Sequence, residues 1–255
     1  MEATVDIGTA VRAGRNRFYL WTAGVFMLIA FGGFIPTYWA PVTRGTFEAP
    51  AIVHVHGVLL FSWTLLYLVQ TALVDRGRIA NHRAWGLFGI SLFSVMVCSM
   101  LVTRTVMMQI EQRQGIGESS LHFSAITFCF VPLLVAYFAL AIRNIANPQA
   151  HKRYLYLIMC GLMVPALARV YMVMLAPPPG DSPELPPTFV IIPPVLTASL
   201  LIVVALVHDW RTRGKPHPVY SIGGLVLVAY SLLMVPFSGT ATWLAIARSL
   251  RALGA

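Results

Sequence analysis

The sequence predicts an all-α membrane protein, a polytopic bundle of about seven transmembrane helices, and three observations predict it. Hydrophobic residues make up 58% of the 255 residues, with a mean hydropathy of +0.75. Charged residues make up 11%, against roughly 25% in soluble proteins, so too few charges remain to cover a soluble surface. Seven apolar runs each approach the roughly 20 residues that a helix needs to cross a bilayer.

The seven runs follow one another with short connections. The first comes after three arginines, but it is too long for the apolar region of a signal peptide and no small-residue cleavage site follows it. The runs are Tyr19–Ala40, Pro50–Val74, Ala84–Met107, Leu121–Ile142, Tyr154–Leu175, Pro187–Val207 and Val219–Val235. We therefore expect one transmembrane domain, with a tail at 1–18, the seven-helix bundle at 19–238 and a second tail at 239–255. The second tail fits an interfacial amphipathic helix or the end of helix seven.

The charges between the spans predict the orientation. The first tail and the second, fourth and sixth connections contain twelve basic and four acidic residues. The opposite side contains six basic and five acidic residues. By the positive-inside rule, the N-terminus is cytoplasmic and the C-terminus lies outside, in a bacterial inner membrane. Most of the net charge of +9 is then a topology signal, which calls for a lipid bilayer and not for nucleic acid.

Several kinds of machinery are missing from the sequence. No Asp or Glu is expected deep in a span, which argues against a proton relay through carboxylates. No HExxH motif and no Walker or Rossmann glycine pattern is present. No GxSxG motif is present either. The polar residues expected inside the bundle are histidines, arginines, hydroxyls and amides.

The seven histidines fall into two layers. His54, His56 and His122 belong to the outer half, and His82, His151, His208 and His217 to the cytoplasmic boundary. The cytoplasmic set also fits simple topology anchors, because it stands beside Lys and Arg. His54 and His56 point about 200° apart on a helix, so they do not share one centre. The face of His56 continues through Trp63, Tyr67 and Gln70, a polar and aromatic stripe that we expect to line a cavity or to bond a neighbouring helix.

Two arginines are expected inside the outer half of their spans. Arg104 and Arg169 would cost several kcal/mol there unless they were paired or hydrated. They are candidates for holding an anionic group such as a carboxylate, a propionate or a lipid phosphate. The alternatives are pairing with Glu111, Glu118 or a backbone carbonyl, or snorkelling outwards.

Two resemblances carry further expectations. The HGxxxxxW pattern from His56 to Trp63, HRxxG at His82–Gly86, HKR at His151–Arg153 and HP at His217–Pro218 resemble an uncharacterised family of bacterial seven-helix membrane proteins. Spans two to five, with a histidine on each, are similar to the core of the two-haem b-type cytochromes that act as transmembrane ascorbate ferrireductases. This second resemblance implies an outer haem between His56 (or His54) and His122, an inner haem between His82 and His151, and arginines on the propionates. Two axial imidazoles from facing helices are the chemistry that such a haem needs.

These observations leave several functions open. The first is a membrane redox protein, an oxidoreductase with haem b that moves electrons across the membrane. The second is a binding or transport protein for a quinone or a small anionic or amphipathic ligand. The third is a metal-dependent enzyme, in which histidines join Asp209 on a transition metal. The last is a subunit of a larger membrane complex. The ligand cavity of the second hypothesis would be lined by His56, Trp63, Tyr67, Gln70, Arg104 and Arg169.

Overall fold

The computed structural model describes residues 17–175 and 184–253. Within these ranges the chain is helical, with no strand, and seven helices are long and apolar enough to cross a membrane. The predicted all-α bundle is therefore confirmed. Most of the tail predicted at 1–18 lies outside the described residues, as does the very end of the tail at 239–255.

The helices follow in chain order. They are α1 (Phe18–Gly33), the π-helix η2 (Ile35–Trp39), α2 (Ala40–Thr43), α3 (Ala51–Asp75), α4 (Ile79–Arg113), α5 (Glu118–Arg143), α6 (Pro148–Leu175), the 3-10 helix η3 (Thr188–Ile191), α7 (Ile192–Arg213), the π-helix η4 (Val219–Gly223), α8 (Gly224–Ser238) and α9 (Ala241–Ala252). The first span joins α1, η2 and α2, the sixth joins η3 and α7, and the seventh joins η4 and α8.

Several spans are longer than the apolar runs that predict them. The third begins at Ile79 and ends at Arg113, beyond the expected limits at 84 and 107. The fifth begins at Pro148, six residues before the expected start at 154. Backbone hydrogen bonding continues through charged residues at a helix end, where a search for apolar runs stops.

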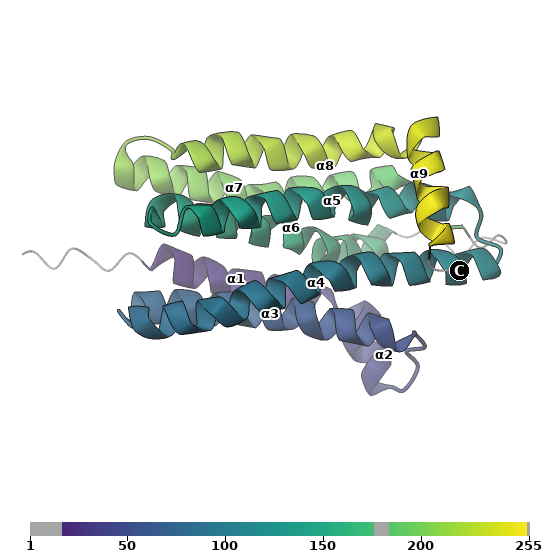
Figure 1. The fold of residues 1–255 in the computed structure, drawn as a ribbon, viewed down its shortest axis with the longest axis horizontal. Coiled ribbons are helices and arrows are strands. Elements are labelled where there is room, and N and C mark those ends of the chain that lie inside the picture. The colour runs from purple at the N-terminus through teal and green to yellow at the C-terminus, as the bar shows by residue number, and fades with distance from the viewer. Residues whose placement is uncertain (1–16, 176–183, 254–255) are drawn as a thin grey trace, which may run out of the picture.

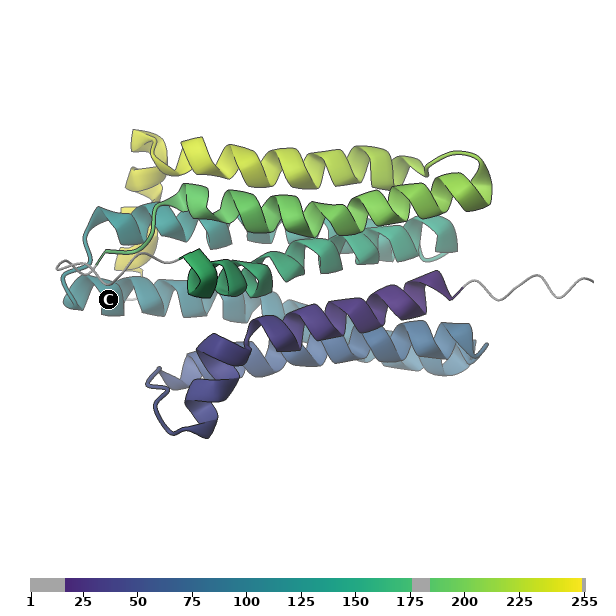
Figure 2. The same cartoon turned by 180° about the vertical axis from the view of Figure 1, so that it is seen from behind.

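Five helices close a ring, and two more cover one side of it. α1 lies between α3 and α6, and the ring continues from α3 through α4 and α5 back to α6. α7 and α8 form a further layer on α5 and α6, as Figures 1 and 2 show. In this ring α5 stands between α4 and α6, so side chains of α4 and α6 that point inward can meet in the interior of the ring.

The first span changes its helical form at Pro36. The amides of Tyr38 and Trp39 both donate to the carbonyl of Phe34, over 2.9 and 3.1 Å, which widens the turn. Just before this point Gly33 lies against α6. A Cβ added there would be 2.5 Å from the carbonyl oxygen of Ala166, so only glycine allows this approach.

α9 is a separate helix and does not continue the seventh span. It lies across one end of the bundle (Figure 1). Thr240 caps it by accepting the amide N–H of Trp243, and the Trp243 indole donates to the carbonyl of Leu121 over 2.9 Å. Trp243 and Ala247 are buried against α4 and α5.

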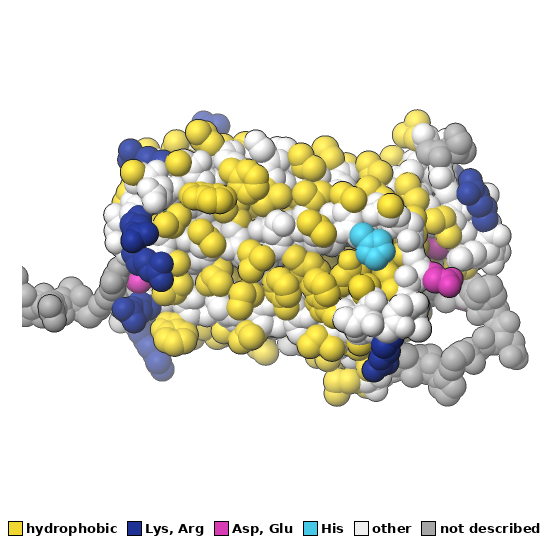
Figure 3. Space-filling model, turned by 90° about the horizontal axis from the view of Figure 1, so that it is seen from below, with side chains coloured by type: hydrophobic (Ala, Val, Ile, Leu, Met, Phe, Trp, Pro, Cys, Tyr) yellow, Lys and Arg dark blue, Asp and Glu magenta, His cyan; other side chains and the backbone are white. Residues whose placement is uncertain are grey.

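The surface is banded. Figure 3 shows Lys and Arg gathered at the two ends of the bundle, with hydrophobic side chains between them. This band matches the apolar zone that a membrane protein presents to lipid. We refer below to the end near Phe18 as the predicted cytoplasmic end and to the end near α9 as the predicted outer end.

Candidate functional site

His82 and His151 meet near the predicted cytoplasmic end. Each is the fourth residue of its helix, α4 for His82 and α6 for His151. Their ring centroids are 6.4 Å apart and the ring planes are 82° to one another. Both residues are partly exposed. The resemblance to b-type cytochromes predicted this pair, whereas local sequence pattern did not.

A hydrogen bond at Nδ1 holds each ring in place. Nδ1 of His151 lies 2.8 Å from the carbonyl oxygen of Ala141, which can only accept. Nδ1 of His82 lies 3.0 Å from Oε1 of Gln70, and Nε2 of Gln70 donates to the backbone carbonyl of His82 over 3.2 Å. Nδ1 is therefore the protonated nitrogen of each ring. The Nε2 atoms keep a free lone pair and have no hydrogen-bond partner in the described part of the chain.

The two cations that follow His151 are directed elsewhere. Arg153, which fits an anchor by sequence, is 2% exposed and forms a bidentate ion pair with Asp209 of α7. The ammonium of Lys152 lies 4.6 Å from the ring centroid of Tyr19 on α1. Both charges therefore contact residues of other helices, Asp209 on α7 and Tyr19 on α1.

His217 has a structural role between α7 and η4. Its amide donates to Oδ2 of Asp209 over 3.1 Å, and its Nδ1 accepts the amide N–H of Val219 over 3.2 Å. Burial, and then the charges of Arg153 and Arg213, lower the pKa of His217 below the ordinary 6.5. Its ring is therefore neutral at pH 7, and the Nδ1 lone pair is already used.

The outer histidines are held in the same way but do not meet. Nδ1 of His56 lies 3.1 Å from Oγ of Ser99, which itself donates to a carbonyl on its own helix, so the ring is the donor. Nδ1 of His122 donates to the carbonyl of Ser238 over 2.8 Å. No ring contact joins His56 to His122 among the described residues. His54 turns the other way and bonds to the Tyr38 hydroxyl over 3.0 Å.

Arg104 pairs with Glu111, which was one of the alternatives expected for it. It bonds to both carboxylate oxygens of Glu111, one of them over 3.0 Å, and also to the carbonyl and hydroxyl of Ser120. The Ser120 hydroxyl donates to Glu111 over 2.5 Å. Because its charge is already neutralised, Arg104 is not the free cavity arginine that the sequence suggested.

Two acids are buried where the sequence placed loops. Glu111 is inside the third span and Asp209 inside the sixth, and both are buried. Both lie beyond the expected apolar runs and within four residues of the ends of their helices, at Arg113 and Arg213, so neither contradicts the expectation that no acid lies deep in a span. Each carboxylate is neutralised by an arginine, Arg104 for Glu111 and Arg153 for Asp209.

The stripe from His56 to Gln70 divides between two regions. Trp63 and Tyr67 are 5% and 7% exposed, and the Trp63 ring packs against Phe93 and Phe138 at 5.2 and 5.9 Å. The cavity hypothesis required these two side chains to line open space, but they are packed core residues. The Gln70 side chain is hydrogen-bonded to the ring and the backbone carbonyl of His82.

Arg169 has no carboxylate partner among the described residues. Its Nη1 donates to the carbonyl of Pro165 on its own helix over 3.2 Å, and its guanidinium carbon lies 4.2 Å from the centroid of the Phe34 ring. Of the expected alternatives, the structure therefore gives it a backbone carbonyl, and the contact with the Phe34 ring was not predicted.

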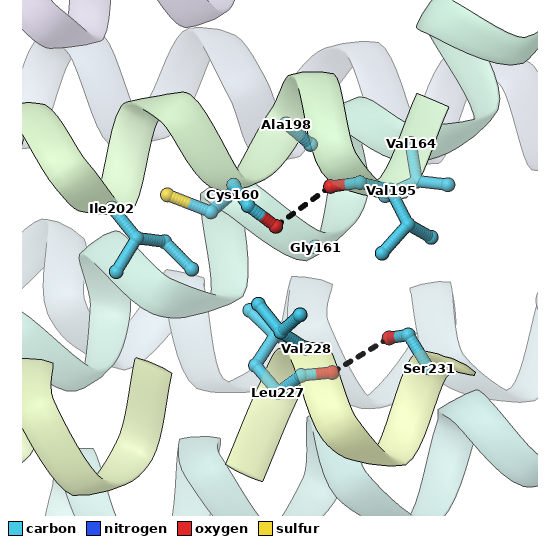
Figure 4. A pocket seen from close by; sticks show the side chains of 10 residues that line it. Cys160, Gly161, Val164, Val195, Ala198, Ile202, Leu227, Val228 and Ser231 are labelled. Carbon is cyan, nitrogen blue, oxygen red and sulfur yellow. Dashed lines mark hydrogen bonds between the residues drawn. The ribbon is translucent and has the colours of Figure 1, made fainter. Parts of the chain in front are cut away.

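Neither a metal cluster nor the core pocket supplies another site. In the described part of the chain, no group of three His, Cys, Asp or Glu side chains comes together to hold a metal ion. A pocket between α6, α7 and α8, shown in Figure 4, has a volume of about 10 Å³, room for one water molecule. Its Ser231 hydroxyl is bonded to the carbonyl of Leu227 over 2.7 Å.

Comparison of this chain with family models, curated proteins and solved structures finds no match. Both resemblances therefore stay predictions.

Proposed function

We propose that this chain is a membrane redox protein that binds a b-type haem between His82 and His151. The observation that carries the proposal is the 6.4 Å separation of the two rings, with both Nδ1 atoms held by acceptors. His82 and His151 would hold the haem iron through their Nε2 atoms, which have no hydrogen-bond partner among the described residues.

A haem suits this pair better than a bare metal ion does. A protein-bound transition metal such as zinc takes about four ligands, and no third ligand group joins these histidines in the described residues. A haem needs only two protein ligands, and His82 and His151 would supply them. When bound, haem supplies one-electron chemistry. Gln70 and the Ala141 carbonyl would orient the rings and raise their basicity through Nδ1.

The position of the pair indicates the side of electron exchange. His82 and His151 lie near the arginine-rich end that the positive-inside rule assigns to the cytoplasm. We propose the bacterial inner membrane as the location and the cytoplasmic face as the side where this haem would exchange electrons. A second haem at His56 and His122 is not part of this proposal, because these rings are not in contact.

An absorption spectrum tests the proposal. Protein expressed with ample haem and purified in detergent is expected to show a Soret band, with sharp bands on reduction by dithionite. His82→Ala and His151→Ala should each lose this haem, while His54→Ala, a histidine bonded only to Tyr38, should keep it. The 82° angle between the rings predicts a highly anisotropic low-spin EPR signal. Absence of a Soret band, or full haem content in both variants, would refute the proposal.

Gln70 provides a second test that does not depend on losing the haem. Gln70→Leu removes the acceptor from Nδ1 of His82, so the His82 imidazole becomes a less basic ligand and the reduction potential of the haem rises. Gln70→Glu offers a stronger acceptor, so the potential falls. Opposite shifts measured by redox titration support the assignment, and equal potentials in all three proteins contradict it.

A further inference from the structure

Arg169 is a cation inside a membrane span that has no counter-ion among the described residues. It stands six residues before the end of α6 at Leu175, about 9 Å along the helix. No described carboxylate lies within ion-pair distance of it, although Arg104 and Arg153 each have one. A charge in this position is costly unless something neutralises it, and such residues mark functional sites in membrane proteins.

The guanidinium is held in a fixed place. It lies over the Phe34 ring, and Phe34 is the residue that joins α1 to the π-helix η2. The backbone of α1 is also close to α6 here, because Gly33 touches Ala166 one turn before Arg169. One N–H bonds to the carbonyl of Pro165, and the other guanidinium N–H groups have no acceptor among the described residues. A rigid fork of donors is the group that proteins use for carboxylates and phosphates.

Neighbouring elements also contain unused polar atoms. His56 on α3 has an Nε2 atom with no described partner. Thr37 Oγ1 and Trp39 Nε1, in the η2 helix that packs on α6, are buried without a hydrogen-bond partner. Thr103 Oγ1 on α4, one turn from the Ser99 that holds His56, is in the same state. Buried polar groups are nearly always paired, and these three hydroxyl and indole groups have no partner among the described residues.

We propose that the predicted outer half of the bundle binds the anionic head of an amphipathic molecule, with Arg169 as its anchor and Phe34 as one wall. The head group is a carboxylate or a phosphate, because these accept two parallel N–H bonds from one guanidinium. Val170 and Val173 on the same helix are exposed on the apolar surface, so the tail would lie along lipid-facing residues. This site is independent of the haem proposal and shares none of its ligands.

Two probes separate the two sources of such a head group. Native mass spectrometry with dioleoyl phosphatidic acid, and with phosphatidylcholine as the zwitterionic comparison, tests for a lipid phosphate. Thermal unfolding with sodium benzoate tests for a soluble carboxylate. The wild type is expected to retain phosphatidic acid in preference to phosphatidylcholine, or to bind benzoate with an affinity that the shift in unfolding temperature reports. This preference or affinity is expected to fall at least tenfold in Arg169→Gln and less in Arg169→Lys. Arg248→Gln, which removes an exposed arginine paired with Glu118, is the matched control and should bind normally.

A third measurement reports on Arg169 without any ligand. If Arg169 is kept for binding, Arg169→Gln removes an unpaired charge and raises the unfolding temperature of the ligand-free protein, whereas a structural arginine would lower it. Phe34→Leu keeps the charge, removes the aromatic wall and should weaken binding several-fold. The proposal is overturned if neither probe distinguishes the wild type from Arg169→Gln. The haem spectrum of Arg169→Gln should be unchanged, so failure here leaves the haem proposal standing.

Discussion

Asp209→Asn tests the buried ion pair that joins α6 to α7. Asp209 is fully buried and Arg153 is 2% exposed. The carboxylate accepts two bonds from the guanidinium, one from Nε over 2.9 Å, and a third from the amide of His217 over 3.1 Å. The asparagine leaves the guanidinium buried without a counter-charge and turns one acceptor into a donor. Breaking a buried pair in this way costs about 3–5 kcal/mol.

The assay is SDS-induced unfolding in mixed micelles, followed by circular dichroism and tryptophan fluorescence. Glu118→Gln is the matched control, because its partner Arg248 is 52% exposed and Glu118 is 60% exposed. An exposed pair of this kind contributes less than about 1 kcal/mol. The double variant Arg153→Met with Asp209→Leu should recover most of the lost stability, since it leaves no unpaired charge. A cost for Asp209→Asn no larger than the cost for Glu118→Gln would refute the reasoning.

Three further predictions concern packing and pH. Gly33→Ala should cost about 1–3 kcal/mol in the same assay, because its Cβ meets the Ala166 backbone, while Gly24→Ala, with open space around it, should be neutral. The unfolding free energy should decrease as the pH falls below 6.5, until the pH is below the lowered pKa of folded His217, and His217→Gln should make this decrease smaller. Trp243→Ala, at a side chain 3% exposed, should undock α9 at a cost of about 3–5 kcal/mol. Faster amide exchange confined to α9 would show the undocking, and unchanged exchange there would contradict it.

The seven spans could be predicted because the evidence for them is local. A run of apolar side chains favours a membrane helix whichever residues it later contacts. The helix boundaries were predicted less accurately, because α4 continues to Arg113 through polar residues that a hydropathy pattern excludes. The error in the end of this span affected the interpretation of Glu111. With the span ended at 107, Glu111 was assigned to a loop, and its pairing with Arg104, two turns earlier on the same helix, was left as one alternative among several.

Burial of single polar residues was harder to predict. Arg153 belongs to an HKR triplet that is typical of a topology anchor, yet it is buried against Asp209, 56 positions later in the chain. Its sequence neighbour Lys152 is held over an aromatic ring of another helix. An anchor and a buried ion pair have the same local pattern. Only the presence of a carboxylate on the neighbouring helix distinguishes them.

The sequence alone determined the number of membrane spans and their all-helical character. It also determined the inward face of α3, the second span, on which Trp63 and Tyr67 are buried. These follow from hydrophobicity and helical period, which belong to single residues and single helices. The tertiary structure decided the pairs. It places His82 beside His151, leaves His56 and His122 out of contact, neutralises Arg104 and leaves Arg169 without a described carboxylate. A pair depends on the register and separation of two helices, and neither quantity is written in the residues of one span.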